Sequence, residues 1–138
     1  MSLTGVLSLL RQDPAVAAAL EHVHARGELD VVTPSGARPT LLALLAGAHG
    51  QDDAPAPGAR PLVVVTATGR EADDLVAALA CYLPHDDVAV LPAWETLPHE
   101  RLSPRSDTVA RRLAVLRRLA DPTVGHGPAG PVRVVVVA

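Results

Sequence analysis

The chain has 138 residues, a formal net charge of -3, and a composition that is 49% hydrophobic and 20% charged. These values suit one soluble domain, and they exclude a global positive field that would draw the chain onto DNA or an anionic membrane. With one Trp, one Tyr and no Phe, an aromatic stacking platform for single-stranded nucleic acid is excluded as well. The single Cys and the lack of a signal-peptide pattern predict a cytoplasmic protein without a membrane anchor.

Two short helices are expected at the start of the chain. Apolar residues recur at helical spacing over residues 3–10, and again over residues 16–23, after the helix-starting pair Asp13-Pro14. Gly27 is typical of a helix end. Residues 1–27 are therefore predicted to form an N-terminal helical region.

Strands and helices are predicted to alternate through the rest of the chain. Apolar, β-branched runs of strand length occupy residues 29–33, 62–66, 88–91 and 132–137. Helical patterns follow the first three of these runs. This alternation predicts an α/β domain over residues 28–138, namely a three-layer RecA-like sheet of the P-loop NTPase type, parallel and flanked by helices. Because a parallel strand usually leads into another crossover, we expect the domain to be incomplete at its C-terminus.

Local sequence signals predict where the connections and helix ends lie. The stretch 48–61 is rich in Gly, Pro, Ala and Asp without periodicity, so a flexible connection is expected there. Thr68 and Glu71 have the spacing of a capping box and predict a helix start. Ser106 or Asp107 is expected to cap the last helix.

The loop after the first predicted strand has the frame of a phosphate-binding P-loop without its chemistry. When Gly36 is placed as the second glycine of G-x-x-x-x-G-K-[ST], the first glycine falls on Val31, the lysine on Ala37 and the metal-binding hydroxyl on Arg38. Pro34 also removes a backbone donor from the cradle. The residues of this degenerate P-loop are Thr33, Ser35, Gly36, Ala37 and Arg38.

No other catalytic or metal-binding pattern is present in the sequence. The six His residues are scattered, the lone Cys has no credible His partner, and there is no G-x-S-x-G elbow. We therefore expect this segment to be non-catalytic, with no cofactor and no metal. A stand-alone P-loop-type hydrolase is the enzymatic alternative, and it would require the missing lysine and hydroxyl.

Residues 91–108 form the most distinctive segment. They contain the only Trp and three prolines, and half of the chain's twelve cations lie between Arg101 and Arg118. The prolines stiffen the segment, so it can present a fixed surface to a partner. The candidate interaction residues are Trp94, Glu95, Pro98, Glu100, Arg101, Ser103, Pro104, Arg105, Asp107, Arg111 and Arg112.

Two interpretations of this segment remain open. Trp94 is expected to pack against the end of the sheet, because a chain with few aromatic residues gains much by burying one. The arginines are either an internal network with Glu95, Glu100 and Asp107 or a phosphate-binding patch. The second interpretation corresponds to a DNA-binding module and predicts a steep salt dependence of duplex binding.

The segment from Trp94 to Thr108, with Arg111-Arg112-Leu113, resembles the beginning of the bacterial transcription-repair coupling factors, the Mfd family. Residues 63–71 are similar to the second strand and helix of that region, and residues 32–36 resemble the P-loop region of the excision-repair protein UvrB. The resemblance implies a truncated, UvrB-like N-terminal module. Together with the missing P-loop residues, it leads us to expect a scaffold that docks neighbouring domains through the segment from Trp94 to Thr108. It also implies a parent protein whose motor domains use ATP and Mg²⁺, and whose partners are UvrA, RNA polymerase and duplex DNA.

Overall fold

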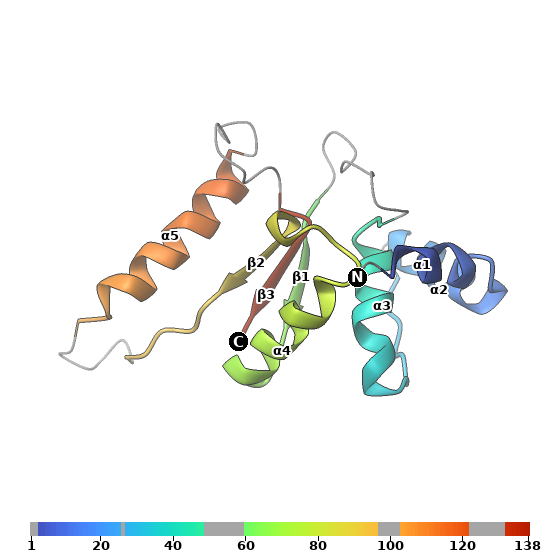
Figure 1. Ribbon diagram of the computed structural model, residues 1–138, viewed down its shortest axis with the longest axis horizontal. Coiled ribbons are helices and arrows are strands. Elements are labelled where there is room, and N and C mark those ends of the chain that lie inside the picture. Colours follow the sequence, from blue (N-terminus) through green and yellow to red (C-terminus); the bar gives the residue numbers. More distant parts are fainter. Residues whose placement is uncertain (1–2, 26, 49–59, 97–102, 122–131) are drawn as a thin grey trace.

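The computed structural model describes residues 3–25, 27–48, 60–96, 103–121 and 132–138, and it shows an α/β arrangement of helices around a small parallel sheet (Figure 1). The predicted α/β class is confirmed. None of the described helices has the length and apolar composition needed to cross a bilayer. The helices are α1 (Thr4–Leu10), α2 (Pro14–His24), α3 (Arg38–Leu45), α4 (Gly69–Leu79) and α5 (Ser106–Ala120), with single 3-10 turns η1 (Ser35–Ala37) and η2 (His85–Asp87).

The described sheet has three parallel strands in the order β1 (Leu62–Val65), β3 (Val134–Val137), β2 (Val88–Leu91). The last strand in the sequence is thus the central one. Its register places Val134 beside Leu62 on one side and beside Val88 on the other. The runs predicted over residues 62–66, 88–91 and 132–137 are confirmed as strands, the last one starting two residues later than expected.

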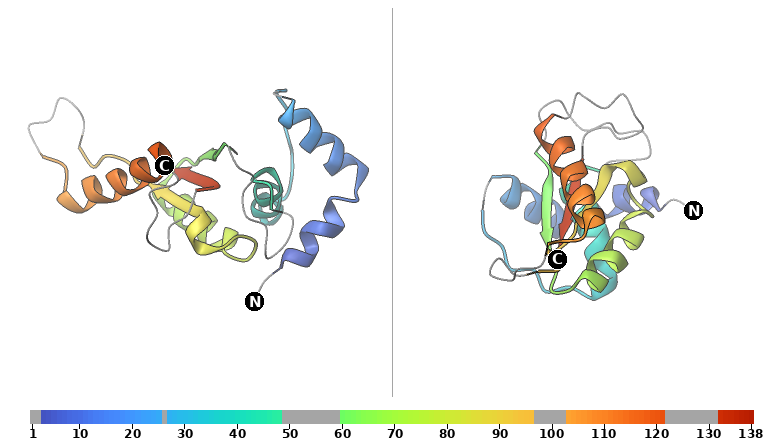
Figure 2. Two further views of the ribbon diagram at one scale, coloured as in Figure 1. Left: turned by 90° about the horizontal axis from the view of Figure 1, so that it is seen from above. Right: turned by 90° about the vertical axis from the view of Figure 1, so that its left-hand side faces the viewer.

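The two faces of β3 define the layers of the fold. Val134 and Val136 belong to a cluster of buried residues that also contains residues from α1, α2, α3 and α4. Val135 faces the other way and packs with Ala89, Val115 and Val132, beneath α5. The sheet therefore lies between α4 and the N-terminal helices on one face and α5 on the other (Figures 1 and 2). A strand buried on both faces explains why the four valines are consecutive rather than alternating with polar residues.

The strand predicted over residues 29–33 is wrong. This segment is extended but belongs to none of the described strands. Leu29, Val31 and Val32 are exposed, and Val32 is 102% exposed. Leu29, Val31 and Thr33 would share one face of a strand, but no described strand pairs with this segment, so its apolar pattern alone does not make it a strand. The P-loop frame inferred from a strand at this position is therefore not present among the described residues.

The N-terminal helices share a core with the sheet. Leu7 of α1 and Leu20 of α2 are buried in the same cluster as Val134. The N–H of Leu3 donates to the carbonyl of Cys81, just after α4, at 2.9 Å. The division at residue 27 stays a prediction, and the flexible connection expected over residues 48–61 falls mainly on residues 49–59, outside the described part of the chain.

Local capping chemistry fixes the ends of α3 and α4. Thr68 Oγ1 accepts from the N–H of Glu71 at 3.2 Å, while Glu71 Oε2 accepts from the N–H of Ala67 at 3.0 Å, which confirms the predicted capping box. After α3, Gly47 has a positive φ of 75° and donates to Leu44, and Ala48 donates to Ala43. This is a Schellman motif, and it requires the left-handed conformation that glycine adopts without strain.

We predict that Gly47→Ala lowers the free energy of unfolding by about 1 kcal/mol, because a Cβ is disfavoured at this φ even though nothing lies within 4 Å of it. Gly36→Ala is the matched control, since its added Cβ also meets nothing within 4 Å and its φ is not positive. Urea denaturation of the two variants measures the difference. Equal stabilities would contradict the assigned helix end.

Candidate functional site

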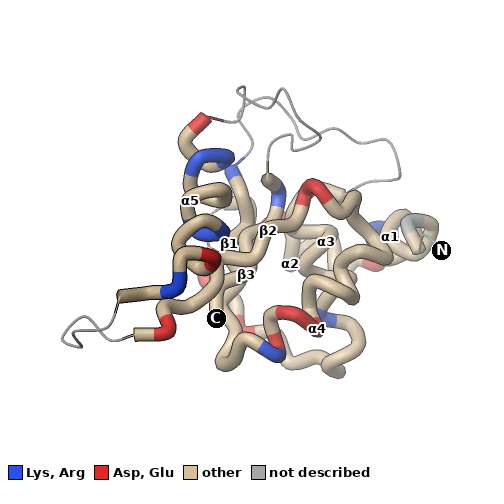
Figure 3. The backbone as a smooth tube through the Cα atoms, turned by 60° about the vertical axis from the view of Figure 1, so that its left-hand side comes forward, with Lys and Arg blue, Asp and Glu red and all other residues tan. Residues whose placement is uncertain are grey.

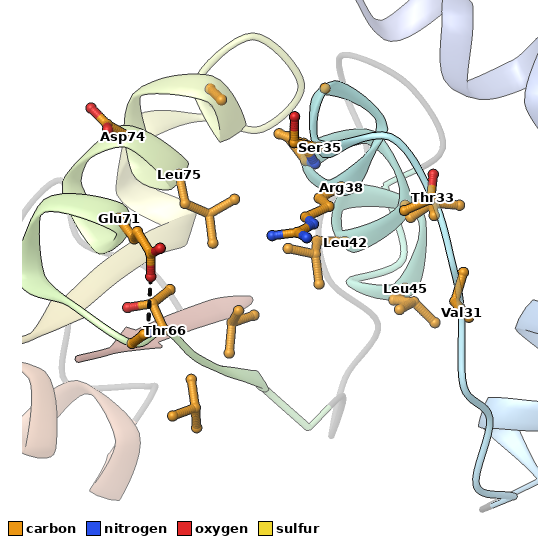
Figure 4. A pocket seen from close by; sticks show the side chains of 17 residues that line it. Val31, Thr33, Ser35, Arg38, Leu42, Leu45, Thr66, Glu71, Asp74 and Leu75 are labelled. Atoms are coloured by element: carbon orange, nitrogen blue, oxygen red, sulfur yellow. Dashed lines mark hydrogen bonds between the residues drawn. The ribbon is translucent and has the colours of Figure 1, made fainter.

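A cleft of about 990 Å³ lies between β1 and α4 on one side and α3 with its preceding segment on the other (Figure 4). Thr66 and Ala67, which directly follow β1, line it, so it opens at the carboxyl end of that strand. In α/β sheets this edge is the usual location of a functional site. The cleft is therefore the first candidate site.

Four of the five predicted P-loop residues line this cleft. Thr33, Ser35, Gly36 and Arg38 are among its lining residues, whereas Ala37 is not. Figure 4 shows the Arg38 side chain extending from α3 into the cleft. The predicted degenerate P-loop residues therefore lie at this cleft, although the strand expected before them is absent from the described sheet.

The start of α3 lacks some of the hydrogen-bond donors that a phosphate-binding turn offers. Pro39, in the first turn, has no N–H to offer. The neighbouring Thr40 hydroxyl is 5% exposed and donates to Tyr82 Oη at 2.9 Å, which ties α3 to the residues after α4. The chain contains no Lys, so Arg38 supplies the cation at this turn.

Most of the cleft wall is aliphatic. Leu42 and Leu45 come from α3, Val64 from β1 and Leu75 from α4. Two carboxylates, Glu71 and Asp74, complete the lining, and Glu71 is already hydrogen-bonded to the backbone of Ala67. Within the described ranges no three His, Cys, Asp or Glu side chains come close enough to hold a metal ion. The cleft thus suits an apolar occupant with a few polar groups at its rim.

The second candidate site is the segment that follows β2, together with α5. Trp94 is 50% exposed, so the predicted burial of its ring is wrong. The Arg112 guanidinium lies over the ring with its central carbon 4.4 Å from the centroid, and its Nη1 donates to the carbonyl of Pro92. This cation–π contact holds one face of the ring while part of the indole stays accessible.

Glu95 caps α5 from ten residues upstream. Its Oε1 accepts from the Thr108 hydroxyl at 2.6 Å, and its Oε2 accepts from the Arg105 N–H at 3.1 Å. The Thr108 hydrogen bond, aided by the N–H and the charge of Arg105, lowers the pKa of the Glu95 carboxyl below its ordinary 4.5, against a smaller effect of desolvation. The cap predicted at Ser106 or Asp107 is wrong, because no residue at the helix start provides a side-chain cap.

The remaining predicted interaction residues divide into three groups. Asp107 and Arg111 form an exposed ion pair at 2.8 Å, one turn apart on α5. Ser103 is exposed and Pro104 half-buried. Pro98, Glu100 and Arg101 lie outside the described residues. Figure 3 shows the cationic residues spaced along α5.

A buried ion pair that was not predicted from the sequence lies at the opposite end of the sheet. Arg133 Nε lies 2.9 Å from Asp87 Oδ2, and the Arg133 side chain is 5% exposed. Burial raises the pKa of the Asp87 carboxyl above its usual 3.8, and the charges of Arg133 and Arg118 partly offset this effect. Arg118 also donates to the carbonyl of Asp86, and this hydrogen bond connects α5 to the turn before β2. A charged residue inside an apolar strand run was the available signal for this pair.

Taken together, the described residues define a three-layer α/β domain with a largely aliphatic cleft beside β1 and a capped, Trp-bearing segment beside β2. No protein-family model matches the chain. The chain is 54% identical over 107 residues to the transcription-repair-coupling factors of Mycobacterium bovis and Mycobacterium tuberculosis. The match covers 75% of this chain and 8% of each relative, so the chain spans less than a tenth of their length. The resemblance to this family predicted from residues 94–113 is confirmed.

We predict that Glu95→Gln makes the melting temperature less dependent on pH between neutral and acidic pH. Because the folded-state pKa lies below the unfolded-state value, the carboxylate stabilises the fold above the unfolded value, and this contribution is lost as pH falls through the folded pKa. The variant should melt at a lower temperature than the parent chain near pH 7, and the difference should shrink as the pH falls below about 4.

Thermal melting monitored by circular dichroism between about pH 7 and pH 3 checks this expectation. Asp73→Asn on the exposed face of α4 controls for the loss of one carboxylate charge. A Glu95→Gln curve parallel to that of the parent chain would show that Glu95 does not cap α5.

Proposed function

We propose that this chain is the N-terminal part of a transcription-repair-coupling factor and that it serves there as a non-catalytic scaffold. The 54% identity to two such factors carries the proposal. The parallel sheet with helices on both faces supports the finer assignment, a RecA-like module related to UvrB. The low coverage of the relatives supports a role as one module of a much larger protein.

The chemistry of the cleft supports an architectural rather than a catalytic role. A triphosphate with its metal needs a lysine, a metal-binding hydroxyl and a cradle of backbone donors. The turn before α3 has Ala37 and Arg38 where the first two would stand, and its proline and its engaged Thr40 hydroxyl reduce the donors further. In this proposal the segment holds no nucleotide, and ATP and Mg²⁺ act in motor domains elsewhere in the parent protein.

The segment from Trp94 to Thr108 is the proposed docking surface for neighbouring domains. The Glu95 contacts to Arg105 and Thr108 hold the described ends of this segment together, so these ends lose little entropy when a partner binds. Half of the Trp94 surface stays accessible, and an exposed aromatic ring beside an arginine is a common interface anchor. Leu113 and Leu116 of α5 are exposed as well and are available for apolar contact.

The same contacts weigh against direct DNA binding through α5. Arg111 is paired with Asp107, Arg112 is held by Trp94 and Pro92, and Arg118 donates to Asp86. A phosphate would have to displace these partners. Contacts with UvrA, RNA polymerase and duplex DNA are accordingly proposed for the parent protein in the cytoplasm and not for this segment by itself.

Two substitutions in the full-length coupling factor test the scaffold. Trp94→Ala and Arg105→Glu should each change the ATPase rate in the absence of RNA polymerase severalfold, because they weaken docking of the adjoining domains. Arg70→Glu, on the exposed first turn of α4, is the control and should leave the rate unchanged. Melting curves of all three variants separate loss of docking from loss of fold. Wild-type ATPase rates in both test variants would refute the proposed docking role.

A further inference from the structure

Five residues join the segment after β2 to the start of α5 in one compact patch. The Arg112 guanidinium covers one face of the Trp94 ring, 4.4 Å from its centroid. Glu95, the next residue in the chain, accepts from the Thr108 hydroxyl and from the Arg105 N–H. Thr108 in turn lies one helical turn before Arg112 on α5. Because each member contacts another, the patch has a defined shape before any partner binds.

Two groups of this patch remain available to a partner. Trp94 is 50% exposed, and Arg112 covers only one face of its ring. Arg105 is exposed, and its hydrogen bond to Glu95 uses the backbone N–H. Its guanidinium forms no hydrogen bond or ion pair with any residue that the structure describes. An accessible indole and an available cation therefore lie on either side of Glu95.

The carboxylates around the patch are already engaged. Both oxygens of Glu95 accept hydrogen bonds at the start of α5, where the helix dipole is positive, and Asp107 is paired with Arg111. Residues 105–118 contain five Arg and one Asp, although the whole chain has a net charge of -3 (Figure 3). This cationic part of an acidic chain complements an acidic partner.

The arrangement of the cations favours a polypeptide over a nucleic acid. A nucleic acid backbone requires several available cations, and Arg111, Arg112 and Arg118 are each engaged within the protein. The Asp107 side chain is 61% exposed on the first turn of α5, and its charge repels phosphate. A single carboxylate requires only one cation, and an apolar side chain beside it can pack on the indole.

We propose that this patch binds an acidic segment of another domain of the coupling factor, outside residues 1–138. An Asp or Glu of that segment pairs with the Arg105 guanidinium, and an aliphatic or proline side chain next to it packs on the open face of Trp94. The inference rests on the proposed function, because it names the partner of the docking surface. The match covers only 8% of each relative, so the rest of such a protein can supply the segment.

A chemical crosslink in the full-length coupling factor tests this pairing. Residues 1–138 contain no Lys, so Arg105→Lys introduces a single lysine amine into this part of the protein. The substitution keeps the positive charge and the N–H that Glu95 requires. A water-soluble carbodiimide condenses the amine with a contacting carboxylate to form an amide, and the carbodiimide takes up the water and becomes a urea. Mass spectrometry should find an Asp or Glu outside residues 1–138 of the same chain in this amide.

Two variants serve as controls for the crosslink. Arg70→Lys, on the exposed first turn of α4, should give about fivefold less of such a product, because no docking surface is proposed there. Adding Trp94→Ala to Arg105→Lys should also lower the yield about fivefold, because packing on the indole holds the carboxylate in place.

Several results would overturn the acidic partner. These are a product with Glu95 alone, a product only with a second copy or with another protein, equal yields from Arg105→Lys and Arg70→Lys, or no product. Protection of the amine by added duplex DNA, with no joined peptide, would identify a nucleic acid instead and would overturn it as well. The ATPase response to Trp94→Ala tests the scaffold role separately, so docking can hold even if the acidic partner is wrong.

Discussion

The central strand β3 is the constraint on which the rest of the fold depends. Val134, Val135 and Val136 are each 2% exposed or less, and they contact two different layers of helices. Burial of a valine side chain contributes about 2 kcal/mol, which is large compared with the small net stability of a domain. Because β3 also supplies the hydrogen-bonding partners of both β1 and β2, the three strands exist as a sheet only when the end of the described chain is in place.

The parallel arrangement of the strands also places the two candidate surfaces at the same edge of the sheet. The cleft opens where β1 ends, and the Trp94 segment begins where β2 ends, so both surfaces lie at the carboxyl edge of the sheet, on opposite sides of β3. In nucleotide-binding α/β domains this edge of the sheet binds the phosphate groups. Here its lining is aliphatic on the β1 side and aromatic and cationic on the β2 side, and each suits contact with polypeptide.

Sequence patterns predicted the features that depend on neighbours in the chain. The capping box at Thr68 and the strands β1, β2 and β3 depend on local spacing and were found as expected, although Val63 and Val65 of β1 are exposed rather than buried. The run over residues 29–33 has similar composition, yet strand formation needs a partner that the described residues do not supply. Contacts between residues that are far apart in the sequence were not predicted either, because local spacing does not indicate a distant partner. Glu95 reaches α5 across ten residues, and Arg133 meets Asp87 across a crossover.

We propose that the turn before α3 belongs to a surface for polypeptide and not to a nucleotide site. Photolabelling of the full-length coupling factor with an azido analogue of ATP and Mg²⁺, followed by peptide mapping, tests this most directly. We expect label elsewhere in the protein and none above background on the peptide that contains Thr33 to Arg38. Saturable label on that peptide, displaced by unmodified ATP, would contradict it.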